Sequence, residues 1–125
     1  MKSLIERLHR LWSTGDFSAI PDIYTPDFVG HMSAGSLLGE LKGHAGVKDA
    51  IEHVRRAVAD FTETIDDIII EGDKAVTRYV CTGVHTKPYF DVEPTGRPIR
   101  VNEISIYHVR GGLVAEQWIL GEKKE

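Results

Sequence analysis

The end of the chain contains the pattern that most restricts the fold. Two stretches rich in Ile, Val and aromatic residues, 99–110 and 113–120, are separated by Gly111-Gly112. A glycine pair between such runs is typical of a tight hairpin turn. We therefore expect the chain to end in two antiparallel strands that fold back on each other.

One face of this hairpin combines large apolar side chains with acid/base groups. Alternation along a strand places these residues on one face: Ile104, Ile106, His108, Glu116, Trp118, Leu120 and Glu122. Such a face is typical of the wall of an apolar pocket with a few polar groups. Curvature or a bulge exchanges the two faces of a sheet, so the opposite assignment stays open. In that case the pocket candidates become Glu103, Tyr107 and Gln117.

The rest of the chain shows helical patterns first and strand patterns afterwards. Helices are expected at 2–13, around 21–24 and at 44–59, and strands at 61–71, 74–85, 99–110 and 113–120. A Gly/Ser-rich loop at 33–43 is a candidate lid. Helices followed by a run of strands indicate the α+β class. We expect residues 1–125 to form one domain, with three helices packed on a curved antiparallel sheet that leaves a cone open at one end.

Composition restricts the partners of the protein. The net charge of −4 has no block of one sign, so neither nucleic acid nor a membrane is an expected partner. No apolar run reaches the roughly 18 residues of a spanning helix, and the N-terminus carries charge where a signal peptide is apolar. The single cysteine, Cys81, excludes an internal disulfide, and the histidine spacings match no metal motif. We expect a cytoplasmic protein without a bound metal.

Many short segments resemble the SnoaL-like polyketide cyclases, often called ester cyclases, of the NTF2-like superfamily. They occur in the family's order and cover nearly the whole chain. The segments are WSTGD (12–16), YTPDFVGH (24–31), GHAGV (43–47), DFT (60–62), EGDKAVTRY (71–79), TGVHT (82–86), PTGR (94–97), IYHVR (106–110) and EQW (116–118).

The resemblance implies an NTF2-like, or cystatin-like, cone and a reaction. In these cyclases a polyketide ester closes a ring by an intramolecular aldol reaction, without a metal or an organic cofactor. A carboxylate shortly after the tryptophan of the last strand takes a proton from the carbon alpha to a carbonyl. Polar groups in the cavity stabilise the resulting enolate.

Three residues are the catalytic candidates. Glu122 stands four residues after Trp118, where the resemblance places the base, although the family usually has aspartate there. His108 is expected to contact the substrate carbonyl or to carry a proton. His31 stands about where related isomerases of the superfamily have their carboxylate, and it is the substitute base.

Six further residues are candidates for substrate binding. Four of them are expected to shape the apolar wall: Trp118, Leu120, Ile106 and Phe28. Arg78 either anchors a substrate oxygen or forms an ion pair inside the sheet with Glu103 or Glu116. His85 ends its strand near the rim of the cone, either in the pocket or on a dimer surface.

The expected function is cofactor-independent acid/base chemistry on an apolar, carbonyl-bearing small molecule. Two alternatives stay open. Epoxide hydrolysis on the same fold needs two carboxylates with an arginine between them, for which Arg78, Glu103 and Glu122 supply the residue types. The other alternative is a binding protein without catalysis, on the same scaffold.

A homo-oligomer, either a dimer or a tetramer, is also expected. The second face of the sheet is too apolar to remain exposed, because it carries Ile99, Val101, Tyr107 and Val109.

Overall fold

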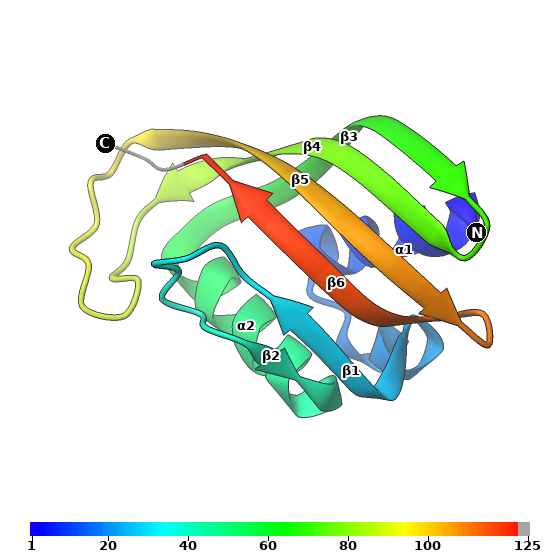
Figure 1. Ribbon diagram of the computed structural model, residues 1–125. Coiled ribbons are helices and arrows are strands. Elements are labelled where there is room, and N and C mark those ends of the chain that lie inside the picture. The colour runs from blue at the N-terminus through cyan, green and yellow to red at the C-terminus, as the bar shows by residue number, and fades with distance from the viewer. Residues whose placement is uncertain (123–125) are drawn as a thin grey trace.

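A six-stranded sheet curls around two α-helices in the computed structural model, which describes residues 1–122 (Figure 1). The helices are α1 (Lys2–Thr14) and α2 (Gly43–Ala57), and the 3-10 helix η1 (Phe17–Asp22) follows α1. The strands are β1 (Tyr24–His31), β2 (Leu41–Lys42), β3 (Val58–Glu71), β4 (Lys74–His85), β5 (Pro98–Arg110) and β6 (Leu113–Gly121). Their order across the sheet is β2-β1-β6-β5-β4-β3.

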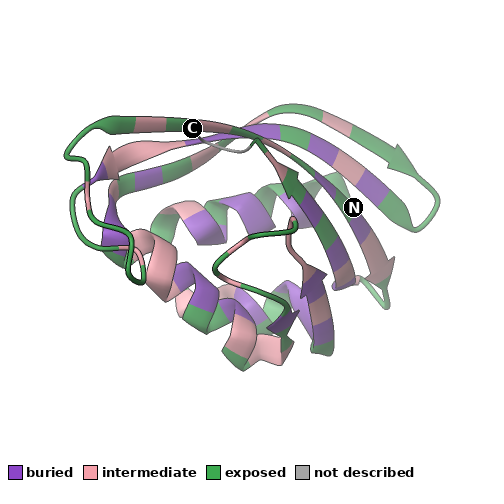
Figure 2. Ribbon diagram, turned by 60° about the vertical axis from the view of Figure 1, so that its left-hand side comes forward, coloured by how far each residue is buried: buried purple, intermediate pink, exposed green. Residues whose placement is uncertain are grey.

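The helices lie against the concave side of the sheet and supply a large part of the core. Each presents one apolar stripe, as the helical spacing predicts. The buried apolar residues of the two stripes are Leu4, Ile5, Leu8, Leu11 and Trp12 of α1 and Val47, Ala50, Ile51 and Ala57 of α2. Figure 2 shows that buried and exposed residues alternate along the long strands. The expected α+β architecture is confirmed.

Two expectations about the elements are corrected. The short helix expected around 21–24 is the 3-10 helix η1, which ends at Asp22, because the residues from Tyr24 on are extended and enter the sheet as β1. The sheet is also mixed, since β1 pairs with β6 in the parallel direction while all other pairs are antiparallel. The local sequence of β1 carries no signal for the direction in which it pairs.

A bulge near the start of β3 determines which of its side chains face the helices. The pairing of β3 with β4 shifts register between Ala59 and Thr62, and Asp60 adopts a positive φ of 57°. Gly83 of β4 lies opposite, and a Cβ there would come within 2.4 Å of Val58 Cγ1. The missing side chain lets β3 bend closely over β4. Beyond the bulge, Glu63 pairs with Cys81 on the concave side.

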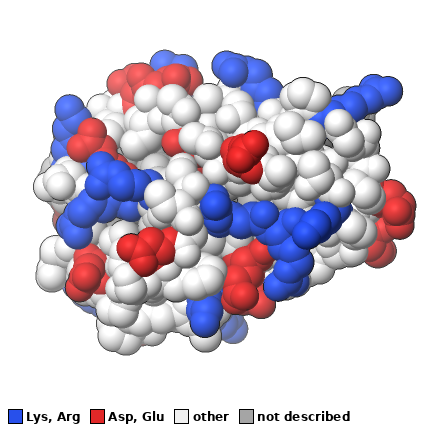
Figure 3. All heavy atoms as spheres, turned by 180° about the vertical axis from the view of Figure 1, so that it is seen from behind, with Lys and Arg blue, Asp and Glu red and all other residues white. Residues whose placement is uncertain are grey.

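The surface of the described residues carries both signs of charge. Figure 3 shows basic and acidic side chains interspersed over the face seen from behind, without a field of one sign. Within residues 1–122, no helix has the length and hydropathy of a membrane-spanning segment.

Candidate functional site

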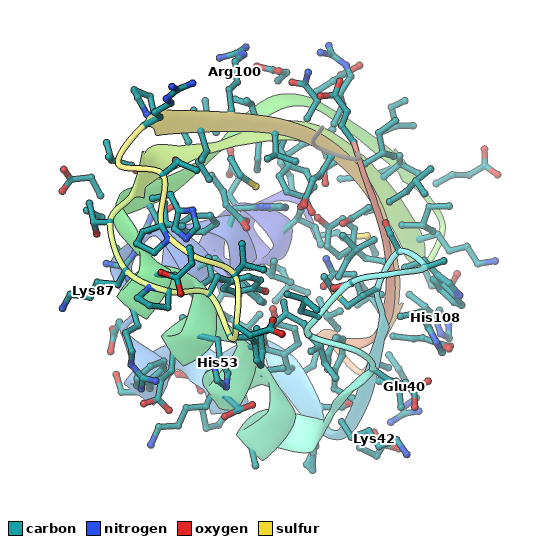
Figure 4. The ribbon with its side chains drawn as sticks, turned by 90° about the vertical axis from the view of Figure 1, so that its left-hand side faces the viewer. Glu40, Lys42, His53, Lys87, Arg100 and His108 are labelled. Carbon is teal, nitrogen blue, oxygen red and sulfur yellow. The ribbon has the colours of Figure 1, made fainter. Side chains whose placement is uncertain are left out.

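A cavity of about 430 Å³ lies between the concave face of the sheet and the helices. Its volume is within the range of pockets that take drug-sized ligands. Most of its wall is apolar, and it includes Leu8, Trp12, Phe61, Val101 and Ile119. Two loops close it, 32–40 through Met32 and Leu38 and 86–97 through Tyr89 and Val92. Figure 4 looks into the interior between the sheet and the helices, with the sheet curving around it.

The structure selects the second assignment of the sheet faces. Glu103 and Gln117 line the cavity, and Tyr107 is fully buried on the same face. The expected wall residues Ile106, Trp118 and Leu120 lie on the outer face, where they are 43%, 41% and 67% exposed. Both faces of the hairpin carry large apolar residues, so alternation alone does not show toward which side the sheet curls.

Glu122 and His108 lie outside the cavity and far from each other along the sheet. Glu122 is exposed, and its Oε1 accepts a hydrogen bond of 3.0 Å from Asn102 Nδ2. His108 contacts Asp73, with 3.1 Å between Nε2 and Oδ2, and in Figure 4 it points away from the interior. The structure therefore does not bring the two expected catalytic groups together.

His31 also lies on the outer face, where it belongs to a surface cluster. Its Nε2 is 2.6 Å from Glu116 Oε2, its Nδ1 is 3.4 Å from Glu40 Oε2, and its ring stacks on Trp118 at 5.5 Å. Arg78 is exposed and pairs with Asp66 at 3.4 Å instead of Glu103 or Glu116.

The two remaining binding candidates lie inside the protein. Phe28 is 1% exposed and packs against Tyr24, with 4.5 Å between the ring centroids, so it belongs to the core and not to the cavity wall. His85 does line the cavity, at the end of β4.

Two carboxyl groups form the polar part of the cavity wall. Glu63 comes from β3 and Glu103 from β5, and both contact the thiol of Cys81 on the strand between them. Glu63 Oε2 lies 3.9 Å and Glu103 Oε1 3.7 Å from Cys81 Sγ. Two carboxyl groups that share one neighbouring atom are close enough to contact the same functional group of a ligand.

A chain of buried hydrogen bonds holds Glu63 in place. His9 of α1 is 2% exposed, and its Nδ1 donates to Glu63 Oε1 at 2.6 Å. Its Nε2 contacts the hydroxyl of Tyr107, which in turn lies 2.6 Å from Thr77 Oγ1. The imidazole therefore occupies one carboxylate oxygen of Glu63, and the second oxygen faces Cys81.

Glu103 is placed differently from Glu63. Burial, followed by the charge of Glu63, raises the pKa of the Glu103 carboxyl above its usual range. Gly121 of β6 pairs with Glu103, and a Cβ on this glycine would approach Glu103 Oε2 to 3.0 Å. The glycine thus leaves room for the carboxyl group. Two carboxyl groups whose surroundings differ in this way are suited to opposite parts of acid/base chemistry.

The other polar groups near the carboxyl pair are not nucleophiles. Burial and the two glutamates raise the pKa of the Cys81 thiol, which keeps it protonated. Burial also raises the pKa of Tyr79, whose hydroxyl lies 2.9 Å from Ser105 Oγ. Within residues 1–122, no group of three potential ligand side chains is arranged to hold a metal ion.

His9 and Glu63 were missed from the sequence, although weak signals for both exist. His9 lies on the apolar stripe of its helix, next to Leu8, and a histidine at such a position needs a polar partner. Glu63 alternates with Phe61 and Ile65, so it shares their inward face. Neither signal shows that the two residues meet.

Comparison with known proteins places these features in a family context. The family model described as SnoaL-like polyketide cyclase matches residues 2–124. IdmH from Streptomyces antibioticus, described as a candidate polyketide cyclase, is 27% identical over 97% of this chain and 91% of its own, with a TM-score of 0.82. TsrD from Streptomyces laurentii is also 27% identical, over 97% and 87% of the two chains, with a TM-score of 0.84.

More distant structures share the fold alone. A protein from Catenulispora acidiphila with a ketosteroid isomerase-like fold is 13% identical, over 94% of this chain and 83% of its own, with a TM-score of 0.78. No curated protein matches the sequence.

Proposed function

Because the chain belongs to the SnoaL-like polyketide cyclase family, we propose that it is an enzyme that needs no cofactor and abstracts a proton alpha to a carbonyl. Its substrate is an apolar, carbonyl-bearing small molecule that enters the cavity between sheet and helices. The single observation that carries the proposal is the pair of carboxyl groups, Glu63 and Glu103, in a wall that is otherwise mostly apolar.

Glu63 is the general base in this proposal. One of its oxygens is held by His9 at 2.6 Å, so the carboxylate has a fixed orientation. The other oxygen lies 3.9 Å from Sγ of Cys81, which also lines the cavity. A carboxylate held in this way can take a proton from a carbon atom without first reorganising.

Glu103 is the hydrogen-bond donor in this proposal. Burial, followed by the charge of Glu63, raises the pKa of this carboxyl group and so favours its protonated form relative to an ordinary glutamate. A neutral carboxyl group in an apolar site donates to the carbonyl oxygen, and this hydrogen bond strengthens as the oxygen gains charge.

The ring closure then follows from the same two groups. Glu63 takes the alpha proton, and the electron pair of the C–H bond forms an enolate whose oxygen Glu103 stabilises. The enolate carbon attacks a second carbonyl of the same molecule and forms the new C–C bond. The second carbonyl oxygen takes up the proton that Glu63 had accepted, directly or through water, and becomes a hydroxyl, which regenerates Glu63.

The proposal is tested by proton exchange, which does not require the natural substrate. In D₂O, the wild-type protein is expected to exchange the methyl protons of 4-acetylbiphenyl faster than buffer of the same composition, as followed by NMR. Binding without faster exchange would favour the alternative of a binding protein without catalysis.

Epoxide hydrolysis has less support in this structure. The cavity does contain two carboxyl groups, but the residue between them is Cys81, and Arg78 lies on the outer face. The arginine that this chemistry needs is absent from the cavity wall formed by the described residues.

We also propose that the protein is a homodimer, through the outer face of the sheet. The expected interface residues Ile99, Val101, Tyr107 and Val109 lie on the inner face, which corrects their assignment. The outer face instead carries the exposed apolar patch Ile104, Ile106, Trp118 and Leu120, in which Ile104 pairs with Leu120 and Ile106 with Trp118.

Charge around this patch favours a second copy of the chain as its partner. Arg78 lies beside Ile104 on the β4 side, whereas Glu116 and Glu122 lie on the β6 side. A two-fold axis that passes through the patch parallel to the strands brings the arginine of each copy toward the glutamates of the other. The cytoplasmic location stays a prediction.

The dimer is tested by sedimentation. We expect the wild-type protein to sediment as a dimer and Leu120→Glu, which adds a charge to the most exposed residue of the patch, to sediment as a folded monomer. The exposed variant Ile69→Glu on β3 is the control, with an unchanged mass. A wild-type monomer, or a Leu120→Glu dimer, would contradict the proposal.

A further inference from the structure

His85 is a buried polar residue in the cavity wall that the proposed chemistry does not use. It ends β4, and its backbone is fixed by two hydrogen bonds to the 86–97 loop: its N–H donates to Arg97 O at 3.1 Å, and its carbonyl accepts from Gly96 N at 2.8 Å. Its side chain lines the cavity, and the residue is 9% exposed. The sheet and the loop therefore fix the position and orientation of the His85 backbone.

The ring nitrogen Nε2 of His85 has no hydrogen-bond partner among residues 1–122, although it is closed off from solvent. Val58, which pairs with His85 across the strands, is apolar, and the same cavity is lined by Val54 and Val92. A buried polar group without a partner costs free energy, and native proteins have few of them. A partner supplied by a ligand removes this cost.

The carboxyl pair and His85 lie at different positions along the same face of β4. Cys81, which contacts both carboxyl groups, precedes His85 by four residues, so both side chains point to the same side. Four residues of extended strand correspond to about 13 Å. The wall between the two positions is apolar, with Ile99 and Val101 on the neighbouring strand.

We infer that His85 is a specificity-determining residue that binds a second oxygen atom of the substrate, at the opposite end of the cavity from the reacting carbonyl. The inference rests on the proposed function, because it takes the carboxyl pair as the reacting end. It assigns to the substrate an elongated apolar frame with an uncharged hydroxyl or carbonyl oxygen at its far end. Because Nε2 is closed off in this structure, the oxygen reaches it only when the imidazole or an adjacent wall side chain rotates.

The test compares two probes that differ by one hydroxyl group. The first is 4-acetylbiphenyl, and the second is 4-acetyl-4′-hydroxybiphenyl, whose oxygens lie at opposite ends of a rigid two-ring frame. Calorimetry gives Kd for each probe, and NMR gives the rate of methyl proton exchange. We expect the wild-type protein to bind the hydroxylated probe about tenfold more tightly, which corresponds to one neutral hydrogen bond.

Variants then assign the preference to the imidazole. His85→Phe fills a similar volume without a hydrogen-bonding group and is expected to bind both probes equally. His85→Gln keeps a polar head and is expected to keep part of the preference. His53→Phe is the matched control, because His53 stacks on Phe90 of the same loop at 4.4 Å but lies outside the cavity wall. It is expected to keep the full preference.

The binding and exchange readouts separate the two hypotheses. If His85→Phe keeps the preference for the hydroxyl, or if the wild-type protein has none, the inference about His85 is overturned. If the preference depends on His85 but neither probe exchanges its protons faster than in buffer, the subsite stands and the proposed chemistry fails. If exchange is rapid in the wild-type protein and the preference is absent, the chemistry stands and the subsite fails.

Discussion

Glu63→Gln is expected to lower the rate of alpha-proton exchange by about 10²- to 10⁴-fold, the usual contribution of a positioned acid/base group. The amide cannot accept the proton, and its shape preserves most of the packing around His9 and Cys81. The measurement is methyl proton exchange of 4-acetylbiphenyl by NMR, together with its Kd. Because the probe still fits, Kd is expected to change little while the rate falls.

Two other glutamates test whether the position of the carboxylate matters. Glu71→Gln, at the exposed end of the same strand, is the matched control and is expected to leave the rate unchanged. Glu122→Gln tests the base that the sequence suggested, and its exposed position predicts the same result. If Glu122→Gln loses the activity and Glu63→Gln retains it, the site is not the cavity described above.

Glu103→Leu is expected to lower the exchange rate by about 10²- to 10³-fold, whereas Glu103→Gln loses much less. Leucine removes the donor to the developing enolate, and losing one such donor typically has this effect. Glutamine still donates through its amide. If Glu103→Gln were as inactive as Glu103→Leu, the result would show that Glu103 accepts a proton. The parts assigned to the two glutamates would then have to be exchanged.

The pH dependence of this pair has a definite sign. Because the pKa of Glu103 is raised in the folded protein, the unfolded chain loses this proton first as the pH rises above about 4.3. Stability from this group is complete below that pH and is lost as the pH rises through the folded pKa. Glu103→Gln carries no such proton, so it is expected to be more stable than the wild type at alkaline pH. Denaturant unfolding at pH 4 and pH 8 measures the difference.

The proton of Glu103 is also expected to control the exchange rate at alkaline pH. The wild-type exchange rate is expected to fall when Glu103 ionises, and this fall with rising pH is expected to be absent in Glu103→Gln. If the rate of the variant falls in the same way, another group is responsible.

The sequence predicted the elements of this fold better than the site. Helical spacing identified α1 and α2, and the Gly111-Gly112 turn identified the final hairpin, because these signals are local. The parallel pairing of β1 with β6 depends on how distant segments meet. No local pattern encodes it, so the sheet was expected to be purely antiparallel.

The site depends on the direction in which the sheet curls. Trp118 and Gln117 are neighbours on β6, yet one lies on the outer face and the other lines the cavity. The sequence identified both sets of residues but could not choose between them, because both faces are rich in apolar side chains. His9 and Glu63 are separated by 54 positions, and only the packing of α1 on β3 brings them together.

The bulge in β3 makes the position of the proposed base insensitive to one change in strand length. From Val58 to Glu63 the chain advances by five residues, whereas the paired segment of β4 from His85 to Cys81 spans four. Loss of one residue between Ala59 and Thr62 would therefore restore regular pairing and leave Glu63 opposite Cys81, on the inner face. Related chains could differ by one residue at this point and keep the same pair of carboxyl groups in the cavity.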